Sequence, residues 1–268
     1  MPQGTRIEFR NVTKRFGESG RGGADNVVVA VQGVSLAVGD REVVSLIGPS
    51  GCGKSTLLNM GSGLYQPTEG QVFIDGKLVS GPNPHVAFML QKDLLLPWRT
   101  IRENVEVGLE IRRVGRAERF ERAMELLDKC HLGQFADHYP HQLSGGMRQR
   151  AALARTLAVD PTVLLMDEPF SALDAQTKMV LQQDLAHRLA DTGKTAIFIT
   201  HDLAESVALS DRILVMSRRP GTIIEEIVVD LPDRNNPMVR RQHKGVGDYV
   251  ARLMSLLQVH EHMDDEEI

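Results

Sequence analysis

The sequence has little cysteine and no long apolar run. Cys52 and Cys130 are the only cysteines among 268 residues, too few for a disulfide framework and suited to a reducing compartment. No stretch reaches the roughly 20 apolar residues that span a bilayer. The first residues, Met-Pro-Gln-Gly-Thr-Arg, lack the apolar core of a signal peptide. We therefore expect the chain to stay on the cytoplasmic side of a membrane.

An excess of positive charge is also absent. The chain has 31 Lys and Arg residues against 35 Asp and Glu residues, a net charge of −4. A protein that binds a long polyanion presents a strongly basic face, so we expect no nucleic-acid partner. With 42% hydrophobic and 25% charged residues, the composition is ordinary for one large globular domain, or for a core with a subdomain.

What the sequence does contain is a glycine-rich stretch, Gly-Pro-Ser-Gly-Cys-Gly-Lys-Ser-Thr at residues 48–56. The apolar run 43–47 enters it and a helical segment leaves it, which is the context of a phosphate-binding loop. Backbone N–H groups of such a loop surround an anion at the positive end of the helix. Lys54 would reach the β- and γ-phosphates, and the Ser55 hydroxyl would bind Mg²⁺. The alternative is a plain glycine-rich turn.

Two adjacent carboxylates follow an apolar run typical of a strand buried on both faces of a parallel sheet. The run is 163–166, and the carboxylates are Asp167 and Glu168. The carboxyl end of such a strand is where α/β folds bind ligands. Asp167 suits Mg²⁺, and Glu168 suits a base that orients and deprotonates an attacking water. The alternative is a solvated acidic pair that opens a loop.

Two polar side chains at other strand ends could complete this site. Gln91 ends the apolar run 86–90 and could contact a metal or a water, although a surface amide is the commoner explanation. His201 follows the run 195–199 and could sense the γ-phosphate, although a lone His is more often structural. A position beside the carboxylate strand in a parallel sheet would favour the sensor.

A second possible anion site and one aromatic side chain remain open in the same way. Ser144, followed by Gly145 and Gly146, begins a helix whose free N–H groups could bind an anion. A plain N-cap is the alternative for Ser144. Phe16 could stack on an adenine ring, or could be an ordinary core or turn aromatic.

The remaining pattern predicts strands at 6–12 and 27–38, with a surface loop at 17–26 between them. Helices are expected at 100–114 and 117–131. The second of these helices has an apolar stripe that we expect in the core. Its members are Phe120, Ala123, Met124, Leu127 and Cys130.

The C-terminal part of the sequence predicts a linker at 232–237 and an amphipathic helix at 248–258. His260, His262 and the acidic run 264–267 follow it. These side chains could bind a metal, or they could form a frayed and solvated tail.

Taken together, these segments resemble the ATP-binding subunit of ABC transporters over about residues 5–230. The family's motifs occur here in order: the phosphate loop, Gln91, Leu-Ser-Gly-Gly at 143–146, Asp167-Glu168, Leu173-Asp174 and His201. The resemblance implies an α/β P-loop NTPase fold: a RecA-like parallel sheet, an antiparallel β subdomain and an inserted α-helical subdomain at about 92–158. Residues 231–268 would be a linker, a C-terminal helix and an acidic tail.

The resemblance also implies ATP and Mg²⁺ as cofactors and gives the candidate residues their roles. Phe16 becomes the adenine-stacking aromatic, with Phe in place of the family's commoner Tyr. The residues expected to bind nucleotide are Phe16, Gly48, Pro49, Ser50, Gly51, Cys52, Gly53, Lys54, Ser55, Thr56, Ser144, Gly145 and Gly146. Those expected in catalysis are Lys54, Gln91, Glu168 and His201, and those expected to hold metal are Ser55, Gln91 and Asp167.

Partners follow from the same resemblance. Two copies would close head to tail, so that Ser144 and Gly146 of one chain meet the γ-phosphate held by the other. The expected function is ATP hydrolysis at the cytoplasmic face of the inner membrane, driving import through a separate permease supplied by a solute-binding protein. Segments 95–104 and 219–226 resemble the nitrate, sulfonate and taurine importer branch. The alternative is a soluble ABC-type ATPase that acts on DNA or the ribosome.

Overall fold

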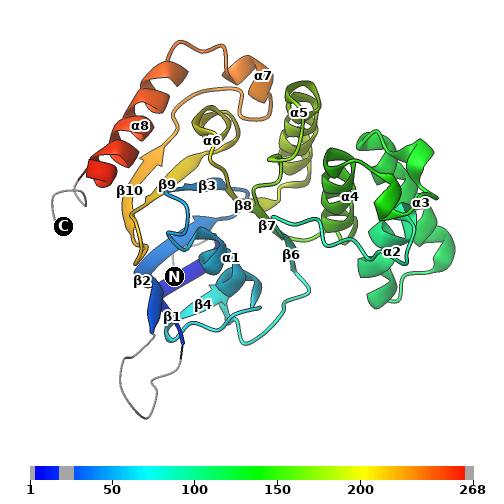
Figure 1. Cartoon of the computed structure of the whole chain (residues 1–268), viewed down its shortest axis with the longest axis horizontal. Helices are drawn as coiled ribbons and strands as arrows, with labels where there is room; N and C mark the ends of the chain where they lie inside the picture. The colour runs from blue at the N-terminus through cyan, green and yellow to red at the C-terminus, as the bar shows by residue number, and fades with distance from the viewer. Residues whose placement is uncertain (1–3, 18–26, 263–268) are drawn as a thin grey trace.

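The computed structural model describes residues 4–17 and 27–262, with side chains as far as residue 257. Two β-sheets and the helices around them form the molecule (Figure 1). The predicted loop at 17–26, apart from its first residue, and the acidic tail lie outside the described residues. The same holds for the side chains of His260 and His262, whose proposed metal site is therefore not addressed.

The larger sheet has six strands in the order β10-β9-β3-β8-β7-β6. Neighbouring strands from β9 to β6 are parallel, and β10 is antiparallel to β9. Every residue of β3, β7 and β8 is buried, as expected for central strands covered on both faces. The strands are β3 Val43–Ile47, β6 Val86–Met89, β7 Val163–Asp167, β8 Thr195–Ile199, β9 Arg212–Met216 and β10 Ile223–Val228.

The smaller sheet is antiparallel, in the order β2-β1-β4-β5. It consists of β1 Thr5–Phe16, β2 Val28–Gly39, β4 Glu69–Ile74 and β5 Lys77–Leu78. Ile7 and Phe9 of β1 share an apolar cluster with Leu57 and Leu58 of the first helix and with Leu165 of β7. This helix, α1, is therefore buried between the two sheets, and the predicted pair of half-buried strands is confirmed.

Helices cover the other face of the larger sheet. Because side chains alternate along a strand, Leu164 and Met166 of β7 face away from α1 and pack with α4 and α5. At one end of the molecule α2, α3 and α4 lie together beside α5 (Figure 1). The helices are α1 Lys54–Ser62, α2 Ile101–Ile111, α3 Arg116–Lys129, α4 Gly145–Ala158, α5 Ala175–Thr192, α6 Leu203–Leu209, α7 Pro237–Arg240 and α8 Val246–His262; short 3-10 turns occupy Gly133–Phe135 and Pro140–Gln142.

The apolar stripe predicted on α3 is only partly correct. Ala123, Leu127 and Cys130 are buried. Phe120, however, is 50% exposed, and its ring lies 5.2 Å from the guanidinium carbon of Arg102. Assigning Phe120 to the core is therefore wrong. Leu126, which the predicted stripe omitted, is buried instead, because α3 is turned toward α4 and α5 on that side.

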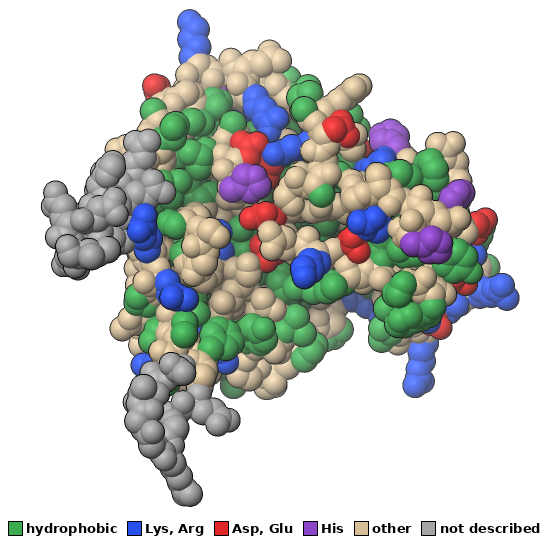
Figure 2. Space-filling view, in the orientation of Figure 1, with side chains coloured by type: hydrophobic (Ala, Val, Ile, Leu, Met, Phe, Trp, Pro, Cys, Tyr) green, Lys and Arg blue, Asp and Glu red, His purple; other side chains and the backbone are tan. Residues whose placement is uncertain are grey.

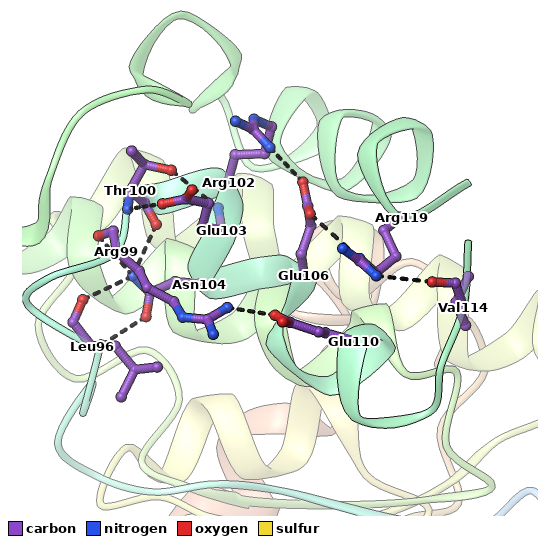
Figure 3. Close-up of polar contacts among 10 residues, drawn as sticks. All are labelled: Leu96, Arg99, Thr100, Arg102, Glu103, Asn104, Glu106, Glu110, Val114 and Arg119. Carbon is purple, nitrogen blue, oxygen red and sulfur yellow. Dashed lines mark hydrogen bonds and ion pairs between the residues drawn. The ribbon is translucent and has the colours of Figure 1, made fainter. Parts of the chain in front are cut away.

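A buried amide fixes the segment between β6 and α2 (Figure 3). The side-chain nitrogen of Asn104 donates to the carbonyl oxygens of Leu96 (3.1 Å), Arg99 (3.2 Å) and Thr100 (2.9 Å). Its side-chain oxygen accepts from the Leu96 N–H at 2.7 Å. Thr100 and Glu103 form a capping box at the start of α2. One fully buried side chain thus bonds four backbone groups of this segment, of which the Thr100 carbonyl also accepts from the Asn104 N–H of α2 and the Leu96 carbonyl from the Arg99 N–H.

A carboxylate joins α2 to α3 in the same region (Figure 3). Glu106, which is buried, accepts from the Arg102 guanidinium at 2.6 Å, and Arg119 of α3 lies 3.6 Å away. Arg119 also donates to the Val114 carbonyl in the turn between the helices. The two cations offset the cost of burying the Glu106 charge.

We expect Asn104→Ala to lower the free energy of unfolding by about 3 kcal/mol, because it removes the side-chain partner of the Leu96 N–H and of the Arg99 carbonyl and leaves a cavity in the interior. Urea unfolding followed by circular dichroism measures the change. Asn83→Ala is the matched control, since Asn83 bonds one exposed N–H and should change stability by less than about 0.5 kcal/mol. Equal effects of the two substitutions would contradict this account.

Candidate functional site

The glycine-rich loop joins β3 to α1 and leaves the first turn of α1 open to solvent. Gly53 is the N-cap residue, with φ 101° and no side-chain cap, so the first N–H groups of the helix are free to meet an anion. A Cβ on Gly53 would lie 2.6 Å from the Ala30 carbonyl oxygen and 2.7 Å from Val31. Only glycine fits this position, both for its left-handed backbone and for the close approach of β2.

Lys54 is held by the loop itself. Its ammonium donates to the carbonyl oxygens of Gly48 and Pro49, both at 2.7 Å. The Cys52 thiol is buried and lies 3.6 Å from the same nitrogen. This arrangement places the positive charge over the mouth of the loop, where a bound phosphate could exchange with the two carbonyls.

The two carboxylates have different surroundings. Asp167, the last residue of β7, is 5% exposed. Burial raises the pKa of its carboxyl group, with a further rise from the Glu168 charge, while a hydrogen bond to Ser55 and the Lys54 charge oppose the shift. Among the ion pairs of the described residues, none involves the Asp167 carboxylate. A bound metal ion would stabilise its negative charge.

Glu168 begins the turn after β7 with φ 51°, a left-handed conformation that is uncommon outside glycine. Its carbonyl oxygen accepts from the Gln149 side chain (2.9 Å) and the Ser171 hydroxyl (3.1 Å). Its carboxylate accepts from the Gln91 amide at 3.2 Å, and His201 Nδ1 lies 3.7 Å away. The strained backbone is thus held on both sides, and the carboxylate is aimed between Gln91 and His201.

Gln91, Glu168 and His201 follow β6, β7 and β8, which are neighbours in the parallel part of the sheet. Figure 2 shows acidic and His side chains near the middle of the face in view, with basic side chains around them. One cavity of about 530 Å³ includes most of the predicted site. The predicted residues that line it are Phe16, Gly48, Ser50, Gly51, Gly53, Lys54, Ser55, Thr56, Gln91, Asp167, Glu168 and His201.

Five predicted residues do not line this cavity. Pro49 and Cys52 belong to the loop but face elsewhere, while Ser144, Gly145 and Gly146 lie at the start of α4. The Ser144 hydroxyl accepts from the Met147 N–H at 3.3 Å, so within one chain it is the N-cap that sequence reasoning left open. Its part in anion binding stays a prediction.

Phe16 lies at the rim of the cavity, at the end of β1, and is 37% exposed. The Tyr65 ring meets it edge-on at 5.6 Å, and the Lys14 ammonium lies 5.3 Å from its centre. The exposed ring can accept a stacked base, which remains a prediction. Sequence reasoning missed the Tyr65 contact, which no local motif indicates. It singled out segment 219–226 but gave its first residue, Arg219, no place in the site, although Arg219 lines the cavity from the turn after β9.

The fold and this site define a P-loop ATPase: an α/β protein whose glycine-rich loop and the polar side chains predicted to act in catalysis meet at the carboxyl edge of a parallel sheet. The profile of the ABC transporter family matches residues 31–171. The chain belongs to this family as an ATP-binding subunit, and its activity is ATP hydrolysis.

Relatives support the same assignment. An uncharacterized ABC transporter ATP-binding protein of Methanocaldococcus jannaschii is 46% identical over 84% of this chain and 83% of its own length. The nitrate import ATP-binding protein of a Synechocystis species is 43% identical over 81% of this chain and 82% of its own. The taurine import ATP-binding protein of Yersinia pestis is 43% identical over 76% of this chain and 80% of its own length.

Solved structures agree with the fold. The ATP-binding cassette MJ0796, in a dimeric post-hydrolysis state bound to ADP and Pi, is 35% identical and superimposes with a TM-score of 0.75. The match covers 83% of this chain and 98% of that one. Among the helices described in our structure, none has the length and apolar character required to cross a membrane.

The raised pKa of Asp167 leads to a stability prediction for the nucleotide-free protein. A carboxyl group whose pKa is higher in the folded state destabilises that state as pH rises above its ordinary pKa of about 3.9. We therefore expect Asp167→Asn to raise the free energy of unfolding at neutral pH, with the gain vanishing below about pH 4.

Urea unfolding at neutral pH and below about pH 4, without nucleotide or magnesium, measures this gain in the free energy of unfolding. Asp137→Asn is the matched control, because its side chain is 85% exposed and should show no such dependence. A lower stability of Asp167→Asn at neutral pH would refute the prediction.

Proposed function

We propose that this chain is the ATP-hydrolysing subunit of an importer for a small solute, an oxyanion such as nitrate, a sulfonate or taurine. The observation that supports hydrolysis is the convergence of Gln91, Glu168 and His201 beside the phosphate loop. The observation that supports import of an oxyanion is kinship: nitrate and taurine import proteins are each 43% identical to this chain.

In the proposed mechanism Lys54 and the free N–H groups of the loop bind the phosphates of ATP. Glu168 accepts a hydrogen bond from the attacking water and then its proton, while Gln91 and His201 hold that carboxylate from both sides. His201 lines the same cavity as the loop and would contact the γ-phosphate. The Glu168 backbone, fixed by Gln149, keeps the base in place with little reorganisation.

Magnesium fits the residues that would hold it. Asp167 and Ser55 line the same cavity, where the hydroxyl lowers the pKa of the carboxyl group, and Gln91 supplies an amide oxygen there. Mg²⁺ is usually bound by a small number of protein oxygens together with phosphate oxygens of the substrate. The ion, when bound, neutralises charge on the transferred phosphate.

We propose that two copies assemble head to tail around ATP. Ser144 and Gly146 lie outside the cavity of their own chain, so a second copy is needed to bring this helix start to the γ-phosphate. The dimeric cassette with 35% identity supports such an assembly. The roles of Phe16 in stacking and of Gly145 in phosphate binding belong to the same proposal.

The segment after Gln91 is proposed to contact a separate permease at the cytoplasmic face of the inner membrane. Trp98 is 72% exposed and Leu94 is also exposed, although Asn104 fixes the backbone between them and α2. A rigid loop with an exposed aromatic anchor is typical of an interface. A solute-binding protein would act through the permease.

In this proposal residues 5–230 form the ATPase domain, with its helical subdomain at about 92–158, and residues 231–268 are an extension. No nucleic-acid partner is proposed. The alternative, an ABC-type ATPase that acts on DNA or the ribosome, is favoured by no observation among the described residues or the relatives reported above.

We expect Glu168→Gln to lower the ATP turnover number at least about a hundredfold, the range for loss of a general base, while ATP affinity stays within about threefold. Phosphate release and fluorescent-nucleotide titration measure the two quantities. Glu121→Gln, on the exposed side of α3, should leave both at the parental values. Parental turnover in Glu168→Gln would rule out this role.

Purification of the tagged chain from detergent-solubilised native membranes tests transport. We expect a multi-span permease to co-purify, and Trp98→Ala to reduce its yield about tenfold, as loss of an interface hot spot does, without changing basal ATP hydrolysis. Val228→Ala, an equally exposed apolar position on β10, is the control. Recovery of ribosomes or DNA in place of a permease would overturn the transport proposal.

A further inference from the structure

A buried polar network lies directly behind the His201 turn and is not used in the mechanism above. Asp202 is the N-cap of α6, and its carboxylate accepts from the Glu205 N–H at 3.0 Å. The same carboxylate accepts from the Lys178 ammonium of α5 at 2.8 Å. The residue next to His201 is therefore tied to another helix by a charge-assisted hydrogen bond.

Lys178 contacts a second carboxylate. Its nitrogen lies 2.7 Å from Glu205, which is fully buried in α6. Burial raises the pKa of Glu205, and the hydrogen bond from Lys178 opposes that shift. One ammonium thus holds both carboxylates of the α6 first turn.

The network continues into the C-terminal segment. Gln182, one turn after Lys178 on α5, donates to Glu205 at 2.8 Å and accepts from Arg241 at 2.7 Å. Arg241 directly follows α7. Lys178 and Arg241 carry two positive charges, and Asp202 and Glu205 carry two negative ones, so the network is neutral as a whole.

Lys178 and Asp202, which are bonded to each other, lie on the segments that follow Glu168 and His201 in the chain. Lys178 lies in the first turn of α5, which begins after Asp174 and continues the chain from Glu168. Asp202 adjoins His201, whose own ring is 70% exposed and meets Glu168 only at 3.7 Å. With so few contacts of its own, the ring depends on the backbone of its turn for its position.

We infer that Lys178 is a positioning residue for ATP hydrolysis: through Asp202 and Glu205 it holds the His201 turn in register with the segment that bears Glu168. This inference rests on the proposed role of His201. The experiment therefore measures the ATP turnover number and the KM for ATP separately, and compares each variant with His201→Ala.

We expect Lys178→Met to lower the ATP turnover number about tenfold or more, the scale for misplacing a catalytic group by a fraction of an ångström, with the KM for ATP within about threefold. Lys178→Arg restores the charge and should recover activity to within about threefold. Combined with His201→Ala, Lys178→Met should cause no further loss, because both act on one step.

Loss of the ammonium leaves buried carboxylates, so folding needs its own control. The double variant Lys178→Met, Glu205→Gln removes one positive and one negative charge, and we expect it to fold but to keep the low turnover. Lys129→Met, which breaks an exposed ion pair with Glu125 on α3, should retain parental turnover. Thermal unfolding of each variant confirms the folded state.

The outcomes separate the two ideas. If His201→Ala keeps parental turnover, the proposed role of His201 fails. If His201→Ala is impaired but the variant with Lys178→Met and Glu205→Gln hydrolyses ATP at the parental rate, the inference about Lys178 is wrong. Independent, multiplicative losses in Lys178→Met and His201→Ala would also overturn it.

Discussion

The structure depends on one geometric constraint: neighbouring parallel strands end at the same edge of the sheet. β3 delivers the phosphate loop to that edge, β7 delivers Asp167 and Glu168, and β8 delivers His201. Apolar packing on both faces fixes the strands, so it also fixes the distances between polar groups that the strands bear. The site is consequently precise even though each polar side chain extends from a turn.

Charge at this edge works against stability, as it does at many functional sites. Asp167 is an anion with a raised pKa beside Glu168, and the Glu168 backbone is strained. Burial also raises the pKa of Glu205, deeper in the molecule, but there Lys178 and Gln182 are direct partners of the carboxylate. The Asp167 carboxylate lines the cavity, whereas the Glu205 carboxylate is paired in the interior.

The helices at the end of the molecule add a second rigid body to the sheet. Asn104 and Glu106 are both buried on α2 and bind the preceding segment and α3 respectively. The segment that leaves the site at Gln91 is thereby fixed where it reaches the surface at Trp98.

The sequence by itself determined the glycine-rich loop between a strand and a helix and the strands at 163–166 and 195–199, because these features depend on neighbours in the chain. It also indicated which side chains end adjacent strands. It could not place Phe120, whose exposure depends on how α3 packs, nor Tyr65 beside Phe16, nor Arg219 in the cavity. Lys178 and Glu205 are likewise paired only by the contact of two helices. Such contacts join residues far apart in sequence, so only the tertiary structure decides them.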